Sequence, residues 1–138
     1  MDDTPQASFD LATLLPFAAL IGIELLDARA ELVRGRLQWS PERCTAGGLM
    51  HGGALMALAD SCGGVCAFLN LPDGAQGTST IESKTNFLRS VRGGAITAST
   101  RPLHAGRTLL VLETEIVRDD GSLAAKVSQT QAFLYPRT

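Results

Sequence analysis

Residues 49–71 read LMHGGALMALADSCGGVCAFLNL, and this stretch decides the fold. Its middle is rich in Ala, Leu and Met, which are strong helix formers. A helix on a protein surface carries a polar stripe, whereas the apolar side chains here point in every direction. We therefore predict that this stretch forms the main helix and that the helix is covered on nearly all sides.

A membrane span is the alternative for an apolar stretch of this length. The stretch contains glycines, has Asp60 at its middle and lacks flanking aromatic or basic anchors. We therefore predict a buried core helix and no transmembrane segment.

Four runs rich in Thr, Val, Ile and Leu follow the helix, at residues 78–89, 95–103, 108–118 and 123–135. Residues typical of turns separate them, at 93–94, 104–107 and 119–122. This pattern predicts a four-stranded antiparallel meander.

Two further patterns precede the helix. Residues 9–20 have apolar side chains at helical spacing, and Pro16 should break that segment. Within residues 22–39, Val33, Gly35, Leu37 and Trp39 share one parity, which predicts a strand with one polar face. With one or two such strands added, the economical packing wraps the sheet around the helix. We predict an α+β fold with a helical lead-in at residues 1–20 and one domain at residues 21–138.

The composition excludes several classes of protein. A chain of 138 residues with 45% hydrophobic residues can bury one core. Its net charge of -2 provides no basic surface for nucleic acid or anionic membrane. Three cysteines leave one thiol over in any disulfide scheme, and the N-terminus does not resemble a secretory signal. We expect a cytoplasmic protein.

The sequence Met50-His51-Gly52-Gly53-Ala54 runs into the start of the main helix. A helix start exposes unpaired N–H groups at the positive end of the dipole, which bind oxyanions or polarise carbonyls. Glycine lets a substrate approach that backbone closely. Alternatively, these glycines only allow tight packing against the sheet, and local sequence leaves both interpretations open.

Asp60 is the one charged residue within residues 44–72. A carboxylate inside an apolar helix is costly unless it is paired or lies against a cavity. The alternative is a structural aspartate, solvated or salt-bridged on an exposed stripe. Gly52 and Asp60 are eight residues apart, which is roughly 12 Å along a helix. If both act on one carbonyl, a two-fold dimer in which Gly52 of one subunit faces Asp60 of the other is the simplest arrangement.

Two motifs carry a family resemblance: HGGALMALAD at residues 51–60, followed by KTNFLR at residues 84–89. Together they resemble the PaaI-like (phenylacetate-pathway) branch of the hotdog thioesterases, in the 4-hydroxybenzoyl-CoA thioesterase superfamily, over residues 21–135. The resemblance implies a hotdog fold, in which an antiparallel sheet of five to six strands wraps a long helix. It also implies dimers that pair their sheets edge to edge, often as dimers of dimers (a homotetramer), with active sites shared between subunits.

The resemblance also implies roles for individual residues. Asp60 would attack the thioester or activate water, and the N–H of Gly52 would polarise the thioester carbonyl. His51 matches a supporting position near the substrate. Thr80 falls where the family commonly has Ser or Thr near the attacking water.

Four residues are candidates for substrate binding. Gly53 offers backbone that a substrate can approach. Thr45 departs from the family pattern, because related enzymes often have an asparagine there and threonine is shorter. Arg89 and Arg107 are the first candidates for the coenzyme A phosphates, since guanidinium groups pair well with phosphate.

The cysteines are poor candidates for chemistry. Cys62 and Cys66 lie one helical turn apart without further ligands at zinc spacing, so we interpret them as small core residues. Cys44 has no base beside it in sequence. We expect neither a metal nor a cofactor, since coenzyme A would be part of the substrate.

The leading hypothesis is hydrolysis of an acyl-CoA or aryl-acyl-CoA thioester to a free acid and coenzyme A. A non-catalytic acyl-CoA-binding hotdog protein is the alternative, and a carboxylate at position 60 argues against it. A hotdog dehydratase needs a histidine and an acid disposed for proton transfer on the acyl carbons, whereas His51 precedes the helix. Whether Asp60 is nucleophile or general base stays open, as does the acyl group.

Overall fold

The computed structural model describes residues 10–137. Its elements in chain order are α1 (Leu11–Leu14), α2 (Pro16–Leu20), β1 (Glu24–Arg29), β2 (Leu32–Gln38), the short 3-10 helix η1 (Pro41–Arg43), α3 (Gly52–Leu69), β3 (Gly77–Phe87), β4 (Ala95–Ala105), β5 (Leu109–Arg118) and β6 (Leu123–Leu134).

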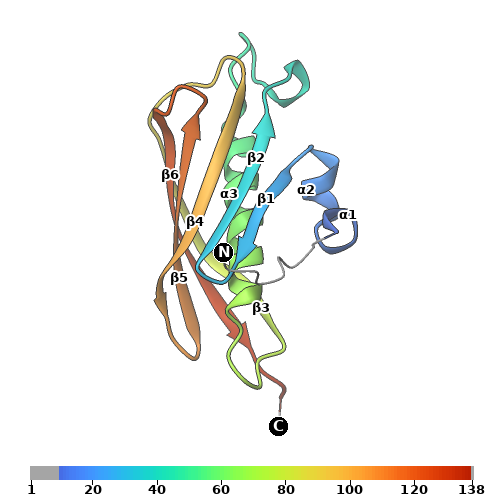
Figure 1. Cartoon of the computed structure of the whole chain (residues 1–138), viewed down its shortest axis with the longest axis vertical. Helices are drawn as coiled ribbons and strands as arrows, with labels where there is room; N and C mark the ends of the chain where they lie inside the picture. The colour runs from blue at the N-terminus through green and yellow to red at the C-terminus, as the bar shows by residue number, and fades with distance from the viewer. Residues whose placement is uncertain (1–9, 138) are drawn as a thin grey trace, which may run out of the picture.

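One six-stranded sheet, in the order β1-β2-β4-β5-β6-β3, curves around α3 (Figure 1). All neighbouring strands are antiparallel. This arrangement confirms the predicted α+β hotdog architecture, in which a sheet of five to six strands wraps a long helix. The helices α1 and α2 lie beside β1 and α3, outside the sheet (Figure 1).

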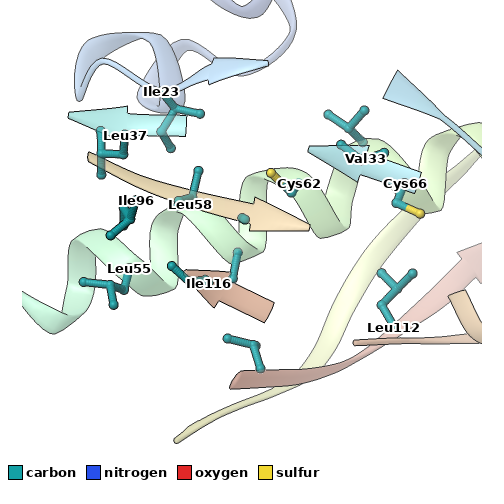
Figure 2. Packing of buried hydrophobic residues seen from close by; sticks show 14 of the residues in the cluster. Ile23, Val33, Leu37, Leu55, Leu58, Cys62, Cys66, Ile96, Leu112 and Ile116 are labelled. Carbon is teal, nitrogen blue, oxygen red and sulfur yellow. The ribbon is translucent and has the colours of Figure 1, made fainter. Parts of the chain in front are cut away.

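The core lies between α3 and the concave face of the sheet. Leu58 and Cys62 of α3 have no exposed surface, and strand residues pack against the side of the helix that carries them (Figure 2). The buried side chains labelled in that view include residues of α3 and of three strands, β2, β4 and β5: Val33, Leu37, Leu55, Leu58, Cys62, Cys66, Ile96, Leu112 and Ile116. The sheet therefore stabilises α3 through hydrophobic burial.

The prediction that the main helix is covered on nearly all sides is wrong for a single chain. Met56 is 41% exposed, Phe68 is 53% exposed, and Asp60 between them is also exposed. Residues four apart share one face of a helix, so these side chains define a face of α3 that the sheet does not cover. The helix is long and apolar enough to span a membrane, yet its other side forms the core of this fold.

The predicted four-stranded meander is also wrong in one strand. Strands β4, β5 and β6 follow one another as hairpins, but β3 pairs with β6 and not with β4. The segment 88–94 between β3 and β4 is not a tight turn. It crosses the start of α3, where the N–H of Met50 donates to the carbonyl of Val91 at 2.8 Å. The main helix thus fixes the topology, because the chain passes the end of the helix to reach β4, which lies beyond β6 and β5 in the strand order.

Residues 22–39 form a hairpin of two strands, β1 and β2, and not one strand. The predicted alternation holds within β2, where Val33, Gly35 and Leu37 are buried. The predicted break at Pro16 is confirmed, since α1 ends before it and α2 begins with it. Residues 1–9 of the predicted lead-in lie outside the described residues.

The packing of α3 gives a direct test with Leu58→Ala. We expect this variant to lower the free energy of unfolding by about 2–5 kcal/mol, because the side chain is fully buried and leaves a cavity. Leu20→Ala is the matched control. Its side chain is 80% exposed, so its loss should cost less than about 0.5 kcal/mol. Urea unfolding of both variants makes the comparison, and equal losses would contradict this packing.

Candidate active site

The start of α3 presents an unpaired backbone donor. His51 is the N-cap, and its Nδ1 accepts the N–H of Gly53 at 2.7 Å. Its carbonyl accepts the N–H of Ala54 at 2.8 Å. The N–H of Gly52 has no acceptor among residues 10–137. This group therefore points its hydrogen away from the helix at the positive end of the dipole, as an oxyanion donor must.

A cavity of about 380 Å³ lies beside this donor, and we call it the Gly52 cavity. Thr45, Phe87 and Arg89 are among its lining residues. A Cβ on residue 52 would lie 3.0 Å from the Phe87 ring, so the glycine lets the ring pack against the helix start. Arg89 donates through Nη1 to the carbonyl of Leu123 at 2.8 Å, which holds its side chain near the cavity.

Asp60 lies two turns further along α3 and is held by polar side chains from the sheet. Its Oδ1 accepts from Nε2 of Gln129 at 2.7 Å and from the hydroxyl of Thr80 at 3.3 Å. The Thr80 hydroxyl in turn accepts from Nε2 of Gln131 at 2.6 Å. The carboxylate is exposed but has no ion pair among the described residues. Neutral hydrogen-bond donors, and not a salt bridge, fix its position.

A second cavity, of about 420 Å³, opens at this carboxylate, and we call it the Asp60 cavity. Its apolar walls include Leu14 and Phe17 of the N-terminal helices and Val65 and Phe68 of α3. Asp60 is the one titratable side chain among its described lining residues. The arrangement places one carboxylate at the edge of an apolar chamber, which suits an acid–base group or nucleophile acting on an apolar substrate.

The two cavities have no lining residue in common in the described part of the chain. Within one chain, therefore, the Gly52 donor and the Asp60 carboxylate do not face the same space. Of the two predicted arginines, Arg89 lines the Gly52 cavity. Arg107 lies in the β4–β5 turn, at the opposite end of the sheet from the start of β6, whose Leu123 carbonyl Arg89 contacts (Figure 1).

Residues 47–125 match the model of the thioesterase superfamily. The chain belongs to this superfamily. An esterase of Saccharolobus solfataricus is 35% identical, over 75% of this chain and 76% of its own. The 1,4-dihydroxy-2-naphthoyl-CoA hydrolase of Escherichia coli is 37% identical, over 63% of each chain.

Solved structures agree in fold. The conserved protein PA5202 of Pseudomonas aeruginosa superposes with a TM-score of 0.79 at 34% identity, over 86% of this chain and 93% of the other. A thioesterase of Haemophilus influenzae superposes with a TM-score of 0.82 at 24% identity, over 94% of each chain. The chain is a thioester hydrolase with the hotdog fold.

The remaining sequence candidates have structural positions in this thioesterase. Cys62 and Cys66 lie in the core, and burial raises the pKa of Cys62 to about 12 and that of Cys66 to about 11. The thiol of Cys44 donates to the carbonyl of Ser40 at 3.2 Å. His51 and Gly53 line a third cavity, of about 210 Å³. Across residues 10–137, no three His, Cys, Asp or Glu side chains gather in a possible metal site.

Sequence reasoning missed Gln129 and Gln131. Both are almost fully buried, on the face of β6 that also carries Val127 and Phe133. Alternation along β6 was enough to find them, because two glutamines occupy positions where the pattern calls for apolar side chains. A buried amide is usually hydrogen-bonded, and here the partners belong to the polar cluster around Asp60.

Proposed function

We propose that this protein hydrolyses an acyl-CoA or aryl-acyl-CoA thioester to a free acid and coenzyme A, in the cytoplasm and without a metal or redox cofactor. The observation that carries the proposal is the Asp60 carboxylate, held by hydrogen bonds at the edge of an apolar cavity of about 420 Å³. The similarity to an enzyme named as a hydrolase of an aryl-CoA thioester supports this choice of substrate class.

A symmetric dimer completes the proposed site. One chain has the oxyanion donor in the Gly52 cavity and the carboxylate in the Asp60 cavity, so a second copy is needed to bring them together. Strand β3 is an edge strand with largely exposed side chains, including the 60% exposed Ile81, and such an edge invites pairing with another strand. Pairing two β3 strands about a two-fold axis would also cover the exposed face of α3. We propose this dimer, further paired as a dimer of dimers, in keeping with the PaaI-like branch.

In the proposed reaction the acyl group enters the Asp60 cavity and the thioester oxygen meets the N–H of Gly52 of the partner subunit. As general base, Asp60 takes a proton from water while the water oxygen bonds to the carbonyl carbon. The carbonyl oxygen becomes an oxyanion, which the Gly52 N–H stabilises. The C–S bond then breaks, and the leaving thiolate receives the proton from Asp60. As nucleophile, Asp60 would instead bond to the carbonyl carbon and expel the coenzyme A thiolate, giving an acyl anhydride; water then hydrolyses the anhydride to the free acid and restores the carboxylate. Both routes require the same carboxylate.

Other residues have supporting roles in this proposal. Thr80 orients the carboxylate through its hydroxyl, and His51 holds the helix start by capping Gly53. Thr45 and Arg89 line the Gly52 cavity, so we assign them to the thioester region and to a coenzyme A phosphate. Arg107 lies away from that cavity and ranks behind Arg89 as a phosphate ligand.

Asp60→Asn tests the central role. The amide keeps the size of the side chain but neither accepts a proton nor attacks a carbonyl, so we expect kcat to fall by about 10²–10⁴-fold. The measurement is release of free thiol from a panel of aromatic and aliphatic acyl-CoAs, which also ranks the acyl groups. Circular dichroism and gel filtration check that fold and oligomer are intact. A fully active variant would remove this mechanism, and ligand binding by a wild-type protein that releases no thiol would favour the binding protein.

Gly52→Pro tests the backbone donor. Proline is tolerated at the first helical position and removes one N–H, and the extended backbone of His51 suits a following proline. Gly52→Ala is the matched control, because it adds a Cβ against Phe87 and keeps the N–H. We expect kcat of the proline variant to lie about 10²–10³-fold below that of the alanine variant. Equal kcat values would exclude this N–H as the oxyanion donor.

Co-expression of Asp60→Asn and Gly52→Pro subunits tests the shared site. Half of randomly formed dimers are mixed, and each mixed dimer has one intact site of two. Thiol release should therefore recover to about a quarter of the wild-type rate. If both groups acted within one subunit, the mixture would stay at the level of the two parent variants.

A further inference from the structure

The Asp60 carboxylate has two oxygens with different surroundings. Both hydrogen bonds from the sheet, from Gln129 and from Thr80, arrive at Oδ1. The other oxygen, Oδ2, has no partner among residues 10–137. One oxygen is therefore anchored to the sheet and the other is free for water or substrate.

The anchor from Thr80 has a fixed direction. Thr78 donates its hydroxyl to Oε1 of Gln131 at 2.9 Å, and Nε2 of Gln131 donates to the Thr80 hydroxyl at 2.6 Å. An oxygen that accepts this N–H turns its own hydrogen toward the next acceptor, which is Oδ1 of Asp60. Neighbouring hydrogen bonds in such a chain polarise and strengthen one another.

The anchor from Gln129 is shorter, at 2.7 Å, and comes from a residue that is only 2% exposed. Its amide also approaches the Thr80 hydroxyl, at 3.4 Å. An amide N–H that donates to a carboxylate makes a charge-assisted hydrogen bond, which is stronger than a neutral one. Gln129 does not line the Asp60 cavity, so it reaches the reaction only through the carboxylate.

The position of the Gln129 amide is costly and depends on a glycine. Its Oε1 is buried without a hydrogen-bond partner among the described residues, an arrangement that lowers stability. A Cβ on residue 63 would lie 1.8 Å from that oxygen, so only glycine leaves room for the amide against α3. Gly63 and Gln129 therefore act together: the absence of a side chain at residue 63 of α3 leaves room for the buried Gln129 amide beside Asp60.

We propose that Gln129, seated by Gly63, is a positioning residue that holds Oδ1 of Asp60 so that Oδ2 faces the bound thioester or its attacking water. This inference rests on the proposed function for its effect on turnover. Because its Oε1 is unpaired within the described part of the chain, Gln129 is poorly suited to stabilising the core, and its hydrogen bond to Asp60 indicates a different role.

Gln129→Met is the main variant, because methionine has a similar length and no polar atoms to leave unpaired. We expect kcat to fall roughly 10- to 100-fold, since small misplacements of a catalytic group have effects of that size. KM should change little, because the residue is outside the cavity lining. The melting temperature should stay the same or rise, because the unpaired oxygen is gone. Thiol release kinetics and thermal unfolding give the three values.

Val127→Ala is the matched control on the same buried face of β6. It should lower the melting temperature and leaves the hydrogen bonds of Asp60 in place, so kcat measured well below that temperature should stay near the wild-type value. A kcat loss in Gln129→Met that merely tracks lost stability, as judged against this control, would overturn the proposal. So would wild-type kcat in Gln129→Met; if Asp60→Asn is inactive at the same time, the proposed function stands and only the role of Gln129 is lost.

Gly63→Ala tests whether the Gln129 amide needs glycine at residue 63. We expect it to reduce kcat as Gln129→Met does, because the new methyl group displaces the amide. In a Gln129→Ala background the same change should have little further effect on kcat, since no long side chain remains to clash. Additive losses in this double-mutant cycle would show that Gly63 acts independently of Gln129 and would contradict their proposed joint role.

A measurement without substrate covers the case in which no acyl-CoA is turned over. The side-chain amide protons of Gln129, assigned by NMR through their loss in Gln129→Met, should shift when Asp60 is replaced by Asn, because a charged acceptor becomes a neutral one. An unchanged resonance would show that the bond to Asp60 is absent and would overturn the proposal irrespective of the enzyme activity.

Discussion

Burial of the apolar helix α3 is the constraint on which the rest of the structure depends. Six strands curve around it and bury residues such as Leu58 and Cys62 completely. The segment between β3 and β4 passes the N-terminal end of this helix, where it contacts Met50, so the helix also determines the strand order. One chain nevertheless leaves the face with Met56, Asp60 and Phe68 exposed. The fold and the proposed dimer therefore both bury apolar surface of α3, and a single chain buries that surface only in part.

The candidate site depends on two parts of α3, its N-terminus and the face that the sheet does not cover. A helix start has N–H groups without intrahelical partners; the His51 side chain accepts the one on Gly53, and that of Gly52 has no acceptor within residues 10–137. Two turns later, a carboxylate appears on the face that the sheet leaves open. Polar side chains from β3 and β6 donate hydrogen bonds to this carboxylate. The rigid helix therefore separates donor and acid within one chain, and a two-fold partner is the simplest means of reuniting them.

Much of the architecture could be predicted from local patterns. The apolar stretch predicted α3, and alternation predicted the strand at β2. Runs rich in Thr, Val, Ile and Leu predicted β3 to β6, and Pro16 predicted the break between α1 and α2. The pairing of β3 could not be read in this way, because strand partners depend on which path the chain takes around the helix. One or two strands were expected before the helix, but the turn at Ala30 and Glu31 that divides residues 22–39 into two strands was not predicted, because it contains neither glycine nor proline.

By itself the sequence determined the elements, the glycine-rich helix start and the lone acid of the helix, because these depend on neighbours along the chain. It also contained the family motifs that the comparisons support at the level of the superfamily. Only the tertiary structure decided which groups hold Asp60. Gln129 is 69 residues away from it along the chain, and the two meet because β6 packs against α3. Contacts between distant segments follow from packing geometry, which no local pattern of residues specifies.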